Sequence, residues 1–402
     1  MADPRGKKPR LPVSRFASTS STRIGSQAMS RTPLTLAESL ALTALIAVLP
    51  LVSGCATSAS SSGSNSPATA ATPSAPTAST PSASAEPPRM SFLTGLPEVT
   101  AAPVLIVKLD NTPNAQPHAG LADADVVFVE EVEWGINRIA AVFSSFIPER
   151  IGPIRSARIS DIDLIAQFGS PAFAFSGAQR KLWPLLEAAP FVDVSANKGG
   201  EGYFRDSDRR APYNYLADGS VLLARADGQA SVSQDIGFVF SDEPPTGGLP
   251  ALKVKAEWPY SKIKLVYDPI AGLYDVWMDG DPARAEEDDG GQQAATVVIQ
   301  YVAQRDSGFG DRGGGSTPLI ESVGSGTGLV LRDGRAWEVQ WSRPDAQSGT
   351  SYTLADGSPM PFKPGQQWVL LVNQERPVKV VEPSASATPL PDASASVLPS
   401  DP

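Results

Sequence analysis

The chain has 402 residues, of which 41% are hydrophobic and 7% aromatic, and its formal net charge is −10. This acidic balance argues against nucleic acid as a partner, because binding to a phosphate backbone depends on basic residues. The single cysteine excludes a disulfide framework, and the single histidine excludes a multi-histidine metal site. We therefore expect neither a metal nor a cofactor.

The N-terminal segment has the pattern of a bacterial lipoprotein signal peptide. Its apolar run at residues 39–52 follows Arg31 and is too short and proline-broken for a comfortable transmembrane helix. The run ends in Val52-Ser53-Gly54-Cys55, which resembles the lipobox, where the cysteine is acylated, for instance with palmitate, and becomes the mature N-terminus. We assign residues 1–55 to a signal peptide, with Met29 as an alternative translation start. The implied location is the cell membrane, lipid-anchored on its extracytoplasmic face.

Two further segments have the composition of unfolded chain. Residues 56–89 are almost only Ala, Ser, Thr and Pro, and residues 383–402 repeat that composition. Neither segment has enough apolar side chains to offset the entropy that ordering would cost. We interpret them as a disordered tether and a disordered tail.

An α/β domain is expected at residues 90–228, where runs typical of strands alternate with runs typical of helices. Gly135-Ile136-Asn137 has the composition of a turn joining two strands of a hairpin. The expected strands lie at 104–109, 126–134, 138–146 and 171–177, and the expected helices begin at 160 and cover 178–189.

A smaller β-rich domain is expected at residues 236–382, so that the fold class is α/β or α+β followed by a β-rich domain. Short apolar runs with Asp-Gly or Gly-rich punctuation indicate a sandwich or barrel. The acidic run at 286–293 is predicted to be an exposed hairpin loop. The expected strands lie at 251–258, 262–268, 273–280, 295–303, 328–334, 336–342 and 367–373.

The stretch GPIRSARISDID, from Gly152 to Asp163, suggests an anion site. Ser160 is a good N-cap and Asp163 stands at the capping-box position, which predicts a helix start at Ser160. Arg155 and Arg158 would then precede a helix N-terminus, whose free N–H groups favour an anion. Two guanidinium groups there could bind a phosphate or a carboxylate.

The segment from residue 203 to 215 is the second arginine-rich stretch. It holds three arginines, two aspartates and four aromatic residues in thirteen positions of an expected loop. The simpler alternative is a structural ion-pair network among the arginines of both stretches and nearby aspartates. That network would consist of Arg155, Arg158, Arg205, Arg209, Asp110, Asp161, Asp206 and Asp208.

Acid–base chemistry has fewer candidates. Glu131 and Glu133 would share one face of a strand, and Glu130 or Asp110 could act as acid or base in a glycosidase-like reaction. Solvated carboxylates are the competing interpretation. His118 is most simply a loop histidine with a local partner.

A series of short motifs in a fixed order resembles the YerB-like bacterial lipoproteins, which carry a domain of unknown function and a C-terminal companion domain. The resemblance covers roughly residues 95–375 and implies a lipid-anchored envelope protein, without implying a reaction. Tyr213 departs from the pattern, which has a histidine before Asn214. The motifs are KLDN (108–111), ADVV (124–127), GINR (135–138), GPIRSAR (152–158), RD (205–206), AP (211–212), VGSG (323–326), LRDG (331–334) and PGQQW (364–368).

These observations lead to three hypotheses. The first is a binding or accessory module for an anionic cell-envelope ligand or a partner protein. The second is an enzyme acting on cell-wall glycan or phosphodiester linkages, with Asp110 or Glu130 as the acid–base group. The third is a purely structural protein whose arginines are paired internally. In the first hypothesis the ligand is held by Arg155, Arg158, Arg205 and Arg209 and oriented by Asp110, Asn111 and Asn214.

Overall fold

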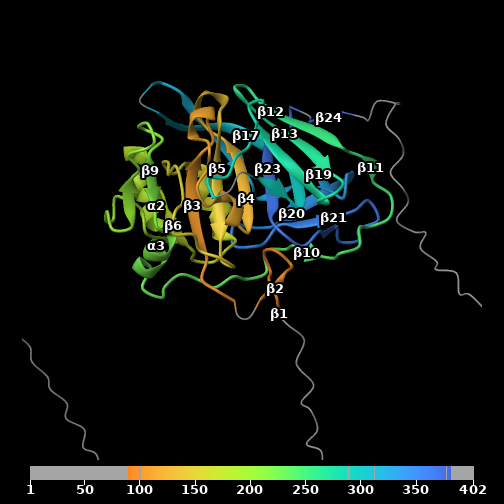
Figure 1. The fold of residues 1–402 in the computed structure, drawn as a ribbon, viewed down its shortest axis with the longest axis horizontal. Coiled ribbons are helices and arrows are strands. Elements are labelled where there is room, and N and C mark those ends of the chain that lie inside the picture. Colours follow the sequence, from red (N-terminus) through yellow and green to blue (C-terminus); the bar gives the residue numbers. More distant parts are fainter. Residues whose placement is uncertain (1–88, 99–100, 288–289, 312, 377, 382–402) are drawn as a thin grey trace, which may run out of the picture. The chain divides into compact units, whose positions relative to one another are not determined.

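The structure, a computed structural model, describes residues 89–98, 101–287, 290–311, 313–376 and 378–381. The predicted signal peptide, tether and tail lie outside these residues, apart from Arg89, which begins strand β1 (Arg89–Met90). Strands predominate in the described fold (Figure 1), so the expectation of an α/β domain is met only in part. The α-helices of the described residues are α1 (Ile159–Ala166), α2 (Trp183–Ala188) and α3 (Gly219–Arg225).

The helix predicted over 178–189 is shorter than expected because of Pro184. This proline stands in the first turn of α2, where its missing N–H costs nothing. The residues before it form the 3₁₀ turn η4 (Arg180–Leu182) instead of helix. Three other 3₁₀ turns are η1 (Pro113–Ala115), η2 (Leu121–Asp123) and η3 (Glu133–Gly135).

The largest element is a twelve-stranded sheet to which both halves of the chain contribute strands. Its main path is β11 (Leu249–Pro250), β20 (Arg335–Arg343), β19 (Gly324–Arg332), β17 (Thr296–Gly310), β23 (Gln367–Asn373), β4 (Val126–Glu131), β5 (Asn137–Phe143), β3 (Leu105–Asp110), β6 (Ala172–Ala174) and β7 (Val192–Asp193). Off this path, β18 (Ser316–Glu321) pairs with β17 and β21 (Ser351–Thr353) pairs with β20.

The two halves of the chain meet inside this sheet. Strand β23 pairs in parallel with β4, from Gln367 opposite Val126 to Leu370 opposite Val129. Figure 1 shows β3, β5, β4 and β23 across the centre of the molecule, and β17 pairs with β23 to continue the sheet. The two expected segments are therefore joined by backbone hydrogen bonds, and the boundaries at residues 228 and 236 remain a prediction.

A second, six-stranded sheet packs on one face of the first. Side chains alternate along β23, so Trp368 and Leu370 face the core shared with Leu265 of the second sheet. Val369 and Leu371 face the opposite core. The second sheet consists of β15 (Asp281–Pro282), β14 (Leu273–Met278), β13 (Ser261–Asp268), β12 (Lys253–Trp258), β24 (Lys379–Val381) and β16 (Gln293–Ala294).

Three two-stranded ladders complete the strands of the described chain. No helix in the described ranges is long and apolar enough to cross a membrane. The ladders are β1 with β2 (Pro97–Glu98), β8 (Tyr203–Arg205) with β9 (Tyr215–Ala217), and β10 (Val239–Phe240) with β22 (Pro361–Phe362).

Candidate functional site

Buried charges gather where strands β3 and β4 end and β5 begins. Lys108 and Asp110 lie on β3, Glu130 lies on β4, and Arg138, on β5, is opposite both Asp110 and Glu130 in the sheet register. Buried charged groups are rare unless they are paired, so each of these side chains requires a partner.

Lys108 is the centre of a fully buried triad. Its Nζ donates to Asp161 Oδ1 at 2.7 Å and contacts Glu130, and all three side chains have no exposed surface. Burial lowers the pKa of Lys108, but the charges of Asp161 and Glu130 outweigh that effect and raise it. Burial, with the nearby charge of Asp161, raises the pKa of Glu130 to about 7. Because its side chain is fully buried, Glu130 does not face a surface where a substrate could bind in this structure.

Asp110 is held between two arginines. Its carboxylate accepts from Arg138 Nη1 at 2.8 Å and from Arg155 Nε, and it also accepts from the Thr112 backbone N–H at 2.9 Å. Burial alone would raise the pKa of Asp110, but Arg138 and Arg155 lower it below its usual value. Asp110 is 0% exposed, so its negative charge forms ion pairs with the two arginines and does not face solvent.

Arg158 is occupied by protein groups. Its Nε and Nη2 donate to the two carboxylate oxygens of Glu133, both at 2.7 Å, and Nη1 donates to the carbonyls of Ser156 and Ala157. Thr317 also donates to Glu133. Burial would raise the pKa of Glu133, but the hydrogen bonds from Arg158 lower it. Nearly all the donors of Arg158 are therefore satisfied internally.

The helix that follows begins one residue earlier than predicted. Helix α1 starts at Ile159, and its cap is Arg158. Asp161 Oδ2, not the side chain of Asp163, accepts from the Arg158 backbone N–H at 2.6 Å. Ser160 does not act as the cap, because its hydroxyl accepts from Ile320 N at 3.0 Å in strand β18. The contact with β18 thus uses the Ser160 hydroxyl, which the local sequence pattern predicts to cap the helix.

These contacts form one interior network with balanced charge. It contains four cations, Lys108, Arg138, Arg155 and Arg158, and four carboxylates, Asp110, Glu130, Glu133 and Asp161. The charges balance over the whole network, although Arg138 and Arg155 share the single carboxylate of Asp110. Arg155 and Arg158 thus have internal carboxylate partners, as the structural alternative expects.

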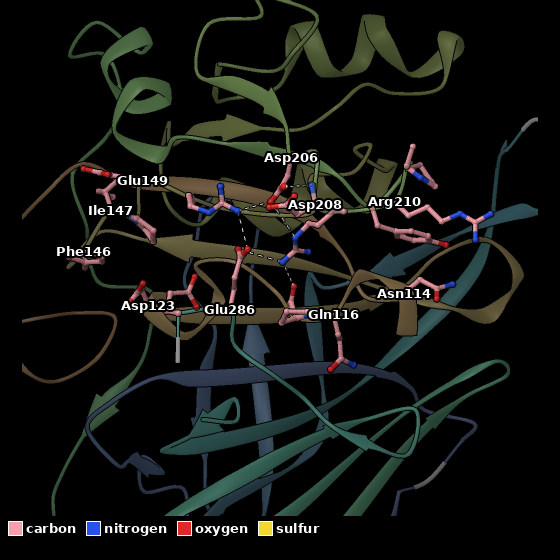
Figure 2. Close-up of a pocket in the computed structure, with 18 residues that line it drawn as sticks. Asn114, Gln116, Asp123, Phe146, Ile147, Glu149, Asp206, Asp208, Arg210 and Glu286 are labelled. Atoms are coloured by element: carbon pink, nitrogen blue, oxygen red, sulfur yellow. Dashed lines mark hydrogen bonds and ion pairs between the residues drawn. The ribbon is translucent and has the colours of Figure 1, made fainter. Parts of the chain in front are cut away.

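The second arginine-rich stretch borders an open cleft with a volume of about 1490 Å³. Figure 2 shows Asp206 and Glu286 facing each other across arginine side chains. Arg150 Nη2 donates to Asp206 at 2.8 Å and to Glu286 at 2.9 Å, and Arg209 lies 3.4 Å from Glu286. The hydrogen bond from Arg150 lowers the pKa of Asp206, and the same contact raises that of Arg150. Three segments that are distant in the sequence, around Arg150, Asp206 and Glu286, thus meet in this cleft.

The lining of the cleft is acidic. Arginine contributes three side chains, whereas Asp and Glu contribute six. Glu149 and Asp208 are exposed and have no side-chain partner among the described residues, and Arg210 is likewise unpaired there. The charged residues are Arg150, Arg209, Arg210, Asp123, Glu149, Asp206, Asp208, Glu286 and Glu287.

The predicted site residues do not form one cluster, although Arg205 and Asn214 contact each other. Arg205 donates to Asn214 at 2.9 Å and lies over the ring of Tyr215, outside the cleft lining. Asn111 donates to the amide oxygen of Asn137 at 2.6 Å in the buried network. Arg209 donates to Pro117 O at 2.6 Å, which ties its loop to the segment before His118.

His118 has the local partner that the sequence suggested, although it is fully buried. Its Nε2 lies 2.6 Å from the main-chain oxygen of Asp110, and burial lowers its pKa. The described chain has no group of three or more His, Cys, Asp or Glu side chains arranged to hold a metal ion.

Sequence reasoning missed Arg138, Arg150 and Glu286 as members of these clusters. Arg138 belongs to the GINR motif, so its place in the family pattern was the available signal. Glu286 follows the antiparallel bridge between Arg284 and Gly291, in agreement with the predicted hairpin loop, and its pairing with two arginines in the cleft is what the sequence does not predict. No local pattern predicts that contact, because Arg150 is more than a hundred residues away.

Comparisons with known proteins agree with the resemblance. The model described as "Protein of unknown function (DUF3048) N-terminal domain" matches residues 93–232, and the DUF3048 C-terminal domain matches residues 254–369. A Bacillus subtilis (strain 168) protein named "Putative lipoprotein YerB" is 28% identical over 293 residues, covering 70% of this chain and 85% of that protein.

A solved structure also matches the fold. The crystal structure of the YerB protein from Bacillus subtilis superposes with a TM-score of 0.61 at 22% identity, covering 72% of this chain and 99% of that one. At this identity the likeness concerns the fold alone. The motifs, both domain matches and this fold together show that the chain belongs to the YerB-like family with paired DUF3048 N-terminal and C-terminal domains.

Proposed function

We propose that this protein is a lipid-anchored, extracytoplasmic binding module and that the acidic cleft holds a positively charged group of its partner. The excess of carboxylates over arginines in the cleft carries this proposal. Clefts lined by one sign of charge concentrate ligands of the opposite sign. Glu149 and Asp208 supply carboxylates that no described side chain neutralises.

This proposal keeps the binding role expected from the sequence and reverses the charge of the ligand. Arg155, Arg158 and Arg209 each have carboxylate partners within the protein. An anion at Arg158 would compete with Glu133, which accepts from both Nε and Nη2 of that guanidinium, whereas Arg155 contacts Asp110 through Nε. The cleft also has acidic neighbours in the sequence, since Asp288 and Asp289 follow Glu287, although these two lie outside the described residues.

The enzymatic alternative receives less support. Asp110 and Glu130 are both 0% exposed, and neither lines the cleft. A general acid or base must reach the proton that it transfers, directly or through one water molecule. We therefore base no reaction on these carboxylates.

The lipid anchor rests on the sequence at Cys55 and on the name of the Bacillus relative. Cys55→Ser removes the only thiol of the chain, so we expect it to abolish incorporation of labelled palmitate. Ser53→Ala keeps a small residue two positions before the thiol and serves as the control. Unchanged incorporation of palmitate into the Cys55→Ser variant would contradict the anchor.

The charge preference of the cleft is tested by calorimetric titration of the full-length protein, in a nonionic detergent, with hexalysine and with hexaglutamate. We expect hexalysine to bind and hexaglutamate not to bind. Glu149→Gln/Asp208→Asn should weaken hexalysine binding about fivefold, since a few exposed charge contacts are worth about 1 kcal/mol. The control Glu187→Gln/Glu375→Gln removes equal charge from exposed positions outside the cleft. Equal weakening by both variants would contradict the proposal.

A further inference from the structure

A second cavity, with a volume of about 560 Å³, lies on another part of the described surface. One wall is formed by the loop before α1 and the segment leading into α2. The other wall is formed by the end of β17 and the start of β18. Its volume falls within the range of about 300–1000 Å³ that is usual for small-molecule sites. The acidic cleft shares none of its lining residues.

The charges of this cavity are nearly balanced, in contrast to the acidic cleft. Its charged lining residues are two cations and two carboxylates: Arg158, Arg180, Glu133 and Asp311. Arg158 and Glu133 neutralise each other at 2.7 Å. Asp311 is occupied by Trp134 Nε1 at 2.9 Å and by the Gly315 N–H at 2.8 Å. The cavity therefore has little reason to select a highly charged ligand.

The rest of the lining combines aromatic rings with amide groups. Trp183 and Phe309 are half-buried, with part of each ring exposed, and Trp183 is supported from behind by Phe175, whose ring centre lies 5.9 Å away. Gln179 and Asn197 provide planar amides. Gln179 Nε2 donates to Gly310 O at 2.6 Å, which leaves its amide oxygen as an acceptor, and Asn197 is exposed without a partner among the described residues. Flat apolar surfaces beside planar hydrogen-bonding groups complement the apolar ring faces and the hydroxyl groups of a sugar.

Trp134 extends this surface beside the cavity. Its side chain is 55% exposed, and its backbone adopts φ 64° and ψ 14°, a left-handed conformation that is uncommon for a residue with a large side chain. The indole is nevertheless fixed, because Asp311 accepts from its Nε1 and Gly315 packs directly against it. Strained backbone that presents a fixed, exposed side chain is a feature of functional sites.

We infer that this cavity and the adjoining Trp134 bind an uncharged oligosaccharide. Trp183 and Phe309 would contact the sugar faces, and Gln179, Asn197 and Arg180 would hydrogen-bond to hydroxyl groups. Arg180 is available for this role because it is exposed and unpaired in the described part of the chain. This inference is independent of the charge preference of the acidic cleft.

The test is a titration of the full-length protein with chitohexaose and with maltohexaose, followed by calorimetry and by tryptophan fluorescence. At least one of these uncharged oligosaccharides is expected to bind saturably. Trp183→Ala should weaken that binding about tenfold, which corresponds to the loss of one aromatic contact of about 1.4 kcal/mol. Trp134→Ala and Asn197→Ala should each weaken it as well, and both positions are exposed enough for the fold to tolerate the change.

The matched control is Trp277→Ala. Trp277 is a half-buried tryptophan on β14 that packs against Lys264 and does not line the cavity. The control should bind the oligosaccharide like the unmodified protein. Absence of saturable binding to either oligosaccharide would overturn the inference, and so would binding that all three cavity variants leave unchanged. Neither result would affect the hexalysine titration, which reports on the other cleft.

Discussion

The buried triad around Lys108 makes the most quantitative prediction of the structure. Lys108→Met removes the one cation, among the residues that the structure describes, that forms ion pairs with both Glu130 and Asp161, whose side chains are 0% exposed. Breaking a buried ion pair by removing one partner costs about 3–5 kcal/mol, because the other charge stays buried. Asp161 retains the Arg158 backbone N–H as a donor, but Glu130 loses its cation entirely. We expect a loss of about 3–5 kcal/mol in the free energy of unfolding at pH 8.

The same variant should be less destabilised at pH 5.5. The pKa of Glu130 is already raised to about 7, so at pH 5.5 this carboxyl group is protonated at little cost and no longer needs the cation. The assay is urea unfolding of the full chain, with and without the substitution, at both pH values. A loss below about 1 kcal/mol at pH 8, or the same loss at both pH values, would refute the reasoning.

A double variant separates this electrostatic effect from the loss of packing. Lys108→Met/Glu130→Gln removes one charge of each sign, so at pH 8 it should be less destabilised than Lys108→Met alone. The coupling between the two side chains is the loss in the double variant minus the losses in the two single variants, Lys108→Met and Glu130→Gln. If the double variant is the less stable of the two, the packing of Lys108 matters more than its charge.

Three further predictions follow from single contacts. Asp218→Ala removes the cap of α3, whose carboxylate accepts from Ser220 N at 2.9 Å and Val221 N at 3.2 Å, and it should cost about 1 kcal/mol in thermal unfolding. Gly315→Ala would place a methyl group 2.6 Å from Trp134 Nε1, so it should cost about 1–3 kcal/mol and shift the tryptophan fluorescence; an unchanged spectrum would contradict the contact. Glu130 has a pKa of about 7 in the folded protein, above its usual 4.5, so between these pH values the folded state binds one more proton than the unfolded state and stability falls as pH rises. Glu130→Gln should flatten this part of the pH profile of the free energy of unfolding. An unchanged slope would mean that another group causes the pH dependence.

Local patterns predict most of the strands because burial alternates along them. β12 alternates between buried and more exposed positions from Lys253 to Trp258, and β20 does so from Trp337 to Arg343. The continuous apolar runs at β3 and β4 were also identifiable, since both faces of these strands are covered. What the sequence could not indicate is that β23 pairs with β4, because parallel pairing across more than two hundred residues leaves no local signature.

The candidate site was predictable in composition but not in pairing. The sequence analysis groups Arg155, Arg158, Arg205 and Arg209 as one set. The structure places Arg155 and Arg158 in the interior network and Arg209 in the acidic cleft, whereas Arg205 hydrogen-bonds to Asn214. Their partners include Glu133 and Glu286, which the sequence analysis assigned to other roles. The sign of the net charge in the cleft depends on those partners, so it could be determined only from the fold.

Hydrogen–deuterium exchange of the full-length protein, with and without hexalysine, tests the proposed binding cleft most directly. Bound peptide should slow exchange in the two segments that carry the unpaired carboxylates, residues 146–150 and 206–213, because both line the acidic cleft. The Glu149→Gln/Asp208→Asn variant should lose that protection, while the Glu187→Gln/Glu375→Gln control should retain it. Protection confined to other segments, or no protection at saturating peptide, would contradict a cationic partner held in this cleft.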